Sequence, residues 1–124
     1  SGGELARVML ALKTILNKQD TIPILIFDEV DTGGGGLVAE KIGVKLKTLA
    51  SKKQVFCITH LPQIAGMAET HFLITKKTNA NRTHTRIQRL EGDERVEEIA
   101  RMSGGAKITE TTRQHAREMI ESSG

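Results

Sequence analysis

The stretch Ile22-Pro23-Ile24-Leu25-Ile26-Phe27, followed at once by Asp28-Glu29, decides the fold. The run is too short for a helix, and its unbroken apolar character is typical of a strand buried on both faces, as in a parallel sheet. Proline has no amide hydrogen to donate, so Pro23 fits only at the start of such a strand. Ligands bind at the carboxyl ends of parallel strands, and this end carries two adjacent carboxylates.

A second apolar run, Val55–Thr59, also predicts a buried strand, and it ends at His60. Between the two runs, apolar residues recur at helical spacing and predict a helix over residues 38–49. Strand, helix and strand in succession predict an α/β fold with a mainly parallel sheet and flanking helices. Neighbouring parallel strands would bring His60 to the same edge as Asp28 and Glu29.

The remaining elements follow from local signals. Ser1 and Glu4 fit a capping box that opens a helix fading near residue 17. A short helix is expected around residues 64–68, and strands over 71–75 and 83–90 are expected to form a hairpin around a polar turn at 76–81. Two helices are expected at the end: residues 93–102, stopped by Gly104-Gly105, and residues 109–121, capped by Thr109.

Composition limits the function classes. The 124 residues allow one domain at most, and no apolar run approaches the ~18 residues of a membrane span. The lone Cys57 cannot form an internal disulfide, which favours a reducing, cytoplasmic location. Aromatic residues are only 2% of the chain, so base stacking as in single-strand binders is not expected. Residues 71–90 contain five Lys or Arg and no Asp or Glu, which suits contact with phosphates, although charge alone favours a solvated hairpin.

Three features carry possible chemistry. Asp28 can hold Mg²⁺, usually through water, and Glu29 can orient or deprotonate an attacking water. His60 can contact a γ-phosphate or polarise water. The helix start at Ser1-Gly2-Gly3 leaves backbone N–H groups open to an anion. Each feature alone also has a plain structural explanation: an acidic turn, a hydrogen-bonding histidine, a capped helix.

Their order is more specific than any one of them. S-G-G-E before a helix, a strand ending in D-E and a later strand ending in His resemble the second half of an ABC-type ATPase head. In that family these are the signature motif, the Walker B motif and the switch histidine. The sequences of residues 27–33 and of Thr59-His60-Leu61-Pro62-Gln63 resemble those of the RecN family of SMC-like DNA repair proteins. Residues 100–112 agree, so the resemblance covers essentially the whole chain.

The resemblance implies roles for single residues. Asp28 would help hold Mg²⁺, Glu29 would be the catalytic base and His60 would sense the γ-phosphate. Family heads dimerise around two nucleotides, so the signature residues would contact ATP held by a partner head; these are Ser1, Gly2 and Gly3. The glycine run at residues 33–36 departs from the family pattern, with Gly35 where an Asp is usual, and receives no assigned role.

The resemblance also implies a partial domain. Residues 1–124 would be the C-terminal lobe of the head, because no G-x-x-x-x-G-K-[S/T] P-loop occurs in them. The chain alone is therefore expected neither to bind nor to hydrolyse ATP, and to need the N-terminal half of the head as a partner. The strands at 55–59 and 71–75 would flank a gap, leaving an isolated chain that is marginal, oligomeric or rearranged. The parent protein would act on DNA in the cytoplasm or nucleoid, without a membrane, in ATP-dependent double-strand break repair and recombination.

Other functions stay open at this point. The chain could be the equivalent segment of another SMC-like or ABC-type ATPase, although the T-H-L-P-Q segment separates it from transporter ATPases. It could instead be a non-catalytic module that binds DNA or a partner through the basic hairpin at residues 76–89. A magnesium-dependent phosphohydrolase built from Asp28, Glu29, Asp31 and His60 is a remote fourth possibility, since such enzymes need more carboxylates.

Overall fold

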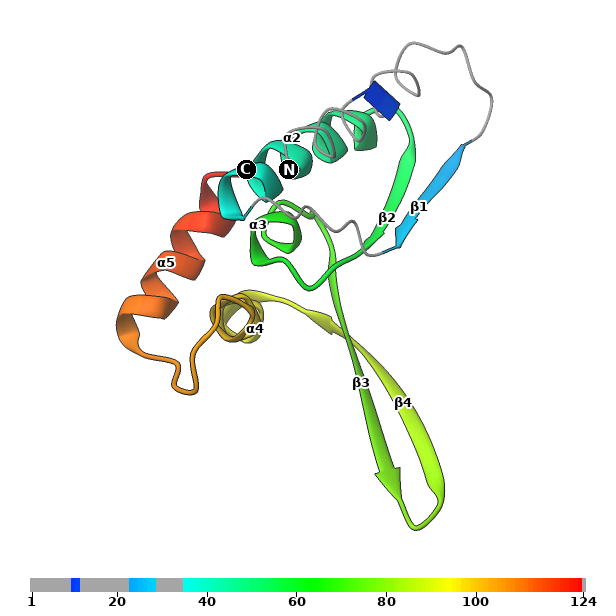
Figure 1. The fold of residues 1–124 in the computed structure, drawn as a ribbon, viewed down its shortest axis with the longest axis vertical. Helices are drawn as coiled ribbons and strands as arrows, with labels where there is room; N and C mark the ends of the chain where they lie inside the picture. The colour runs from blue at the N-terminus through cyan, green and yellow to red at the C-terminus, as the bar shows by residue number, and fades with distance from the viewer. Residues whose placement is uncertain (1–9, 12–22, 29–34, 124) are drawn as a thin grey trace.

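The computed structural model describes residues 10–11, 23–28 and 35–123, which fold into two small sheets and four helices (Figure 1). The result is a mixed α/β fold. None of the helices in this described part is long and apolar enough to cross a membrane. The elements are, in chain order, β1 (Ile24–Asp28), α2 (Gly36–Ala50), β2 (Gln54–Ile58), α3 (Pro62–Ala65), β3 (His71–Asn79), β4 (Arg82–Leu90), α4 (Gly92–Met102) and α5 (Glu110–Glu121).

Strands β1 and β2 form the first sheet, and they pair in parallel as the sequence predicts. Ile26 lies opposite Phe56 and Asp28 opposite Ile58. The amide of Gln54 donates to the carbonyl of Pro23 at 2.9 Å, so Pro23 stands at the strand start and needs no amide hydrogen of its own. The strands are linked by α2, whose buried side packs on one face of the sheet. That core cluster consists of Ala39, Ile42, Leu46, Leu49 and Ile64, with Leu25, Phe27, Val55 and Cys57 packed against it.

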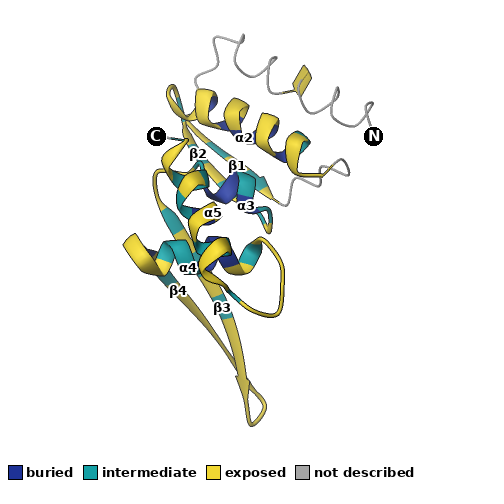
Figure 2. Ribbon diagram, turned by 90° about the vertical axis from the view of Figure 1, so that its left-hand side faces the viewer, coloured by how far each residue is buried: buried dark blue, intermediate teal, exposed yellow. Residues whose placement is uncertain are grey.

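Burial of this sheet on both faces was a wrong prediction for the described residues. Exposure alternates along both strands, and Ile26 and Phe56 on the outer face remain 68% and 49% exposed. The reason is that α2 covers only one face of a two-stranded sheet (Figure 2). A continuous apolar run shows that a strand could be buried on both faces. Whether it is buried depends on whether other elements cover both faces of the sheet.

The second sheet is the hairpin of β3 and β4, which corrects the expectation of a mainly parallel architecture. The two strands pair antiparallel from His71 opposite Leu90 to Asn79 opposite Arg82. They project from the helices as a long ribbon (Figure 1). Among the described residues, strands β2 and β3 belong to different sheets.

The polar turn predicted at residues 76–81 is shorter in the structure. Strand β3 continues to Asn79, and only Ala80 and Asn81 form the turn, with φ of 42° and 71°. Two positive φ values in succession are those of a type I′ turn, whose twist suits a two-residue hairpin. The distal strand residues are exposed on both faces, so no apolar alternation marks them as strand.

Helices α4 and α5 begin and end close to the predicted residues, and a second core lies between them. Its buried residues are Ala65, Ile99, Ala100 and Ala116. The predicted cap of the last helix is confirmed: the amide of Thr112 donates to Thr109 Oγ1 at 3.2 Å, and the amide of Thr109 donates to Thr112 Oγ1 at 2.8 Å. An ion pair of Arg113 with Glu97 fastens α5 to α4. Short helix α3 contributes Ile64 to the first core and Ala65 to the second.

Candidate functional site

The carboxyl-end edge of the β1–β2 sheet holds two of the predicted site residues. Asp28 is the last residue of β1 and is exposed. Its register partner is Ile58, so His60 follows two residues beyond the same edge of the sheet. The expectation that parallel pairing brings Asp28 and His60 to one edge is therefore confirmed at the level of the backbone.

A tight turn presents His60. The amide of Leu61 donates to Thr59 Oγ1 at 3.0 Å, which closes the chain around His60 immediately after β2. Pro62 then occupies the first turn of α3, where a missing amide hydrogen costs nothing. His60 is exposed and so accessible to a ligand, while Pro62 and Ile64 anchor the turn in the core. The Thr-His-Leu-Pro segment thus forms a turn that holds a histidine at the sheet edge.

The other predicted site residues, Glu29, Ser1, Gly2 and Gly3, lie outside the described residues. The same holds for residues 33–34 of the glycine run. Its last two members are described, and they show why glycine stands there. Gly35 has φ 82° and ψ −169°, a combination that side-chain-bearing residues essentially do not adopt, and it precedes the first turn of α2.

Gln63 is a candidate site residue to which the sequence analysis gave no role. A Cβ built on Gly36 would lie 2.9 Å from Gln63 Nε2, so the amide of Gln63 sits against the start of α2. Helix α3 thereby places a hydrogen-bonding side chain beside Gly36, the first residue of α2. The only sequence signal was its position in T-H-L-P-Q, because the contact joins residues far apart in the chain.

The described residues suit Mg²⁺ only in a limited way. Among residues 10–11, 23–28 and 35–123, no three His, Cys, Asp or Glu side chains gather as a metal cluster. Asp28 offers a single exposed carboxylate. One carboxylate fits an ion held mainly by substrate phosphates and water, which is the usual coordination of Mg²⁺ at nucleotide sites.

Arg95 holds the far end of α3. Its Nη2 donates to the carbonyl oxygens of Ala65 and Gly66, each at 3.2 Å, and to that of Ala68 at 2.7 Å. Carbonyls at the end of a helix lack most of their helical partners, although the Ala65 carbonyl also accepts from the amide of Ala68 and that of Gly66 from Ser123 Oγ. A guanidinium suits such carbonyls in charge and hydrogen bonding. Arg95 comes from α4, so this contact ties the segment that follows His60 to the C-terminal helices.

His71 lies beside Arg95 at the base of the hairpin. Burial lowers the pKa of His71, and the positive charge of Arg95 lowers it further, while Glu98 acts in the opposite direction. Burial also lowers the pKa of Arg95. Within the described part of the chain, neither His71 Nδ1 nor Arg95 Nε has a hydrogen-bond partner. The arrangement favours a neutral His71.

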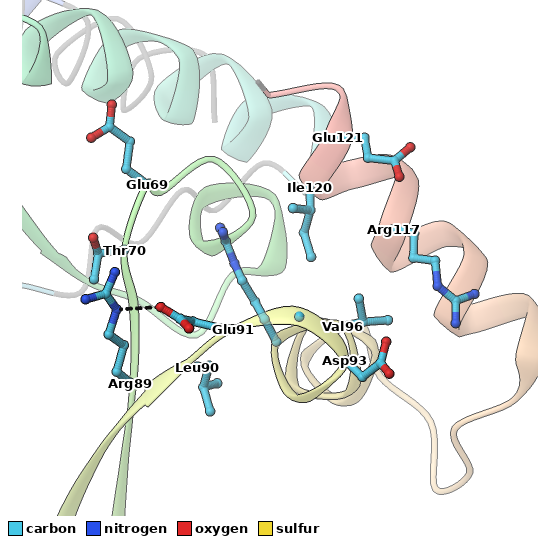
Figure 3. A pocket seen from close by; sticks show the side chains of 12 residues that line it. Glu69, Thr70, Arg89, Leu90, Glu91, Asp93, Val96, Arg117, Ile120 and Glu121 are labelled. Atoms are coloured by element: carbon cyan, nitrogen blue, oxygen red, sulfur yellow. Dashed lines mark ion pairs between the residues drawn. The ribbon is translucent and has the colours of Figure 1, made fainter.

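A hollow of about 450 Å³ opens between the base of the hairpin and helices α4 and α5 (Figure 3). Acidic and basic side chains line it together, among them Glu69, Asp93, Arg117 and Glu121. Arg89 and Glu91 form an ion pair at 3.2 Å on its wall. This mixture of charges shows no preference for one kind of ligand, and neither Asp28 nor His60 lines the hollow.

No protein-family model matches the chain. It is 49% identical over 121 residues to the DNA repair protein RecN of Halalkalibacterium halodurans and to that of Bacillus subtilis. In both comparisons the match covers 98% of this chain and 21% of the relative. The RecN protein of Treponema pallidum is 45% identical over 120 residues, or 97% of the chain. The chain thus spans about a fifth of the length of the curated relatives it matches.

Proposed function

Because the chain is a homologue of the DNA repair protein RecN over nearly its whole length, we propose that it contributes half of the nucleotide site of a DNA repair ATPase. The proposed unit is the C-terminal lobe of an ABC/SMC-type head, spanning residues 1–124. Its proposed cellular role is ATP-dependent double-strand break repair and recombination. Its partners are the P-loop half of the head, a second head that closes over ATP, and DNA.

One observation carries this proposal. Because β1 pairs in parallel with β2, Asp28 and the turn at His60 lie at the same edge of one sheet. In α/β proteins this edge is where nucleotides bind. The match to RecN relatives covers nearly the whole chain, so the similarity is not confined to one short motif.

The proposed roles follow from the chemistry of each group. Asp28 helps to hold Mg²⁺ through water, and Glu29 takes the proton from the attacking water. His60 donates a hydrogen bond to the γ-phosphate, and Ser1, Gly2 and Gly3 contact ATP held by the opposite head. Mg²⁺ bound to ATP supplies positive charge that offsets the charge developing on the phosphates.

ATP hydrolysis tests the proposal. The chain is assayed alone and after mixing with a separately produced P-loop half of a RecN head, and association of the two is checked by size-exclusion chromatography. The variants are Glu29→Gln and His60→Ala. The matched control is Glu40→Gln, which removes the same charge from an exposed position on α2.

We expect activity only in the mixture, with loss of more than about 100-fold for Glu29→Gln, since a general base contributes roughly 10²–10⁴-fold. Glu40→Gln should keep full activity. Activity of the chain alone, or none in a mixture that demonstrably associates, would overturn the proposal. Equal effects of Glu29→Gln and Glu40→Gln would overturn the role of Glu29.

A further inference from the structure

The distal half of the hairpin separates its charges by face. Residues directly opposite each other in an antiparallel pair share a face, and successive residues alternate. Lys77 pairs with His84, Arg86 with Thr75 and Arg82 with Asn79, so all three cations and His84 lie on one face. We call Lys77, Arg82, His84 and Arg86 the basic face.

The opposite face of the same segment is nearly neutral. It carries Thr78 opposite Thr83, whose hydroxyl oxygens are 3.5 Å apart, and Lys76 opposite Thr85. Lys76 and Lys77 are therefore neighbours in sequence with the same charge and with similar exposure, but they point to opposite sides of the ribbon. This pair is a built-in control for any role of the basic face.

The positive charge of the basic face is not compensated. Residues 71–90 contain no Asp or Glu. In the part of the chain that the structure describes, ion pairs involve Arg89, Arg101, Arg113 and Arg117, and none involves the basic face. All four side chains of the basic face are exposed. Solvated cations without internal partners are free to pair with an external polyanion.

The spacing suits a regular polyanion. Alternate residues of a strand are about 7 Å apart. Residues 82, 84 and 86 thus repeat along β4 at an interval comparable to the distance between neighbouring phosphates of one DNA strand. A two-stranded ribbon is also narrow enough to enter the ~12 Å major groove.

We propose that the basic face of the β3–β4 hairpin binds the phosphate backbone of duplex DNA without regard to sequence. The choice of DNA rests on the proposed function, whereas the site itself rests on the charge and register of the hairpin. Between residues 76 and 89 the hairpin has no Phe, Tyr or Trp, the rings on which single-strand binders chiefly stack unpaired bases, so a duplex is the expected form.

Salt-dependent binding tests this inference. Fluorescence anisotropy of a labelled 30-bp duplex is measured with the 124-residue chain at about pH 8, where the charge comes from Lys and Arg. Three phosphate contacts predict a slope of log K against log salt of about −2.7, and hence an affinity about 40-fold weaker at 200 mM than at 50 mM salt. Circular dichroism confirms that each variant remains folded.

The variants then separate the two faces. Lys77→Gln should make the slope of log K against log salt shallower by about 0.9 and weaken binding about tenfold at 50 mM salt, since it removes one phosphate contact. Lys77→Arg should keep the original slope. Lys76→Gln should change affinity by less than about twofold. Arg86→Gln should act as Lys77→Gln does.

Three results would overturn the inference: no salt-dependent binding, equal loss for Lys76→Gln and Lys77→Gln, or tighter binding to a single strand than to the duplex. Glu29→Gln provides the separation from the proposed function. This variant should leave DNA binding unchanged. Loss of ATP hydrolysis therefore tests the proposed function, and loss of DNA binding by the hairpin variants tests this inference separately.

Discussion

The outer face of the β1–β2 sheet should drive self-association of the chain. Four apolar residues lie uncovered there: Ile24, Ile26, Phe56 and Ile58, which are 51%, 68%, 49% and 46% exposed. Complete burial of one such side chain is worth roughly 1.5–3 kcal/mol, so covering the exposed portions of all four would gain about 3–6 kcal/mol per chain. Two chains that pair through this face would gain about twice that, against an association cost of roughly 4–15 kcal/mol.

The test replaces Ile26 and Phe56, which are register partners, by threonine. The double variant gives up about half of that gain, roughly 3–7 kcal/mol per pair of chains, and should be monomeric where the unmodified chain associates. Its own melting temperature should change little, because Thr is a good strand residue and the replaced groups were largely exposed. Sedimentation equilibrium between about 10 and 200 μM, where a dimer of micromolar affinity would be detected, measures the difference.

The neighbouring register pair, Leu25 and Val55, is the control. These side chains pack against the core under α2 rather than facing solvent. Leu25→Thr with Val55→Thr should therefore destabilise the chain itself by about 3 kcal/mol, through lost burial and buried hydroxyls. A monomeric unmodified chain at every concentration, or equal destabilisation by the two double variants, would refute the reasoning.

Three further predictions concern the helices and the hairpin. Arg95→Met should lower the free energy of unfolding by about 3 kcal/mol, because three carbonyls lose one charged donor; urea titration against the conservative Arg95→Lys measures it. His71 has a folded pKa below its usual 6.5, so the unfolded chain binds the proton more tightly. Stability contributed by neutral His71 is therefore complete above about pH 7 and falls as the pH drops through 6.5, and thermal melts of His71→Gln between pH 7 and 5 should show a flatter dependence. Ala80→Gly should raise stability by about 0.5–1 kcal/mol, since Ala80 has φ 42° in a turn that favours glycine; an unchanged or lower melting temperature would argue against a strained turn.

Local signals predicted most of the elements. The apolar stripe gave the core-facing side of α2, and Thr109 marked the start of α5 with a cap that the structure forms. These succeed because a stripe or a cap depends on residues within a few positions of each other. The parallel pairing of β1 and β2 was also predictable, since the helix between them leaves room for a crossover connection.

What failed depended on non-local arrangement. Burial of β1 on both faces required a second covering layer, and the full length of β3 lay in polar residues that carry no apolar pattern. Gln63 and Arg95 looked like ordinary polar residues, because their partners are residues distant in the chain. Chemistry at a sheet edge can thus be located from strand ends, whereas the side chains that support it appear only in three dimensions.

Helix α3 has a mechanical consequence for the whole chain. Its adjacent residues Ile64 and Ala65 belong to different cores, and Arg95 and Ser123 both donate to the carbonyl of Gly66 just beyond it. A single helical turn therefore links the β1–β2 layer to the C-terminal helices, directly after the turn at His60. The position of that turn thus depends on the packing of both cores.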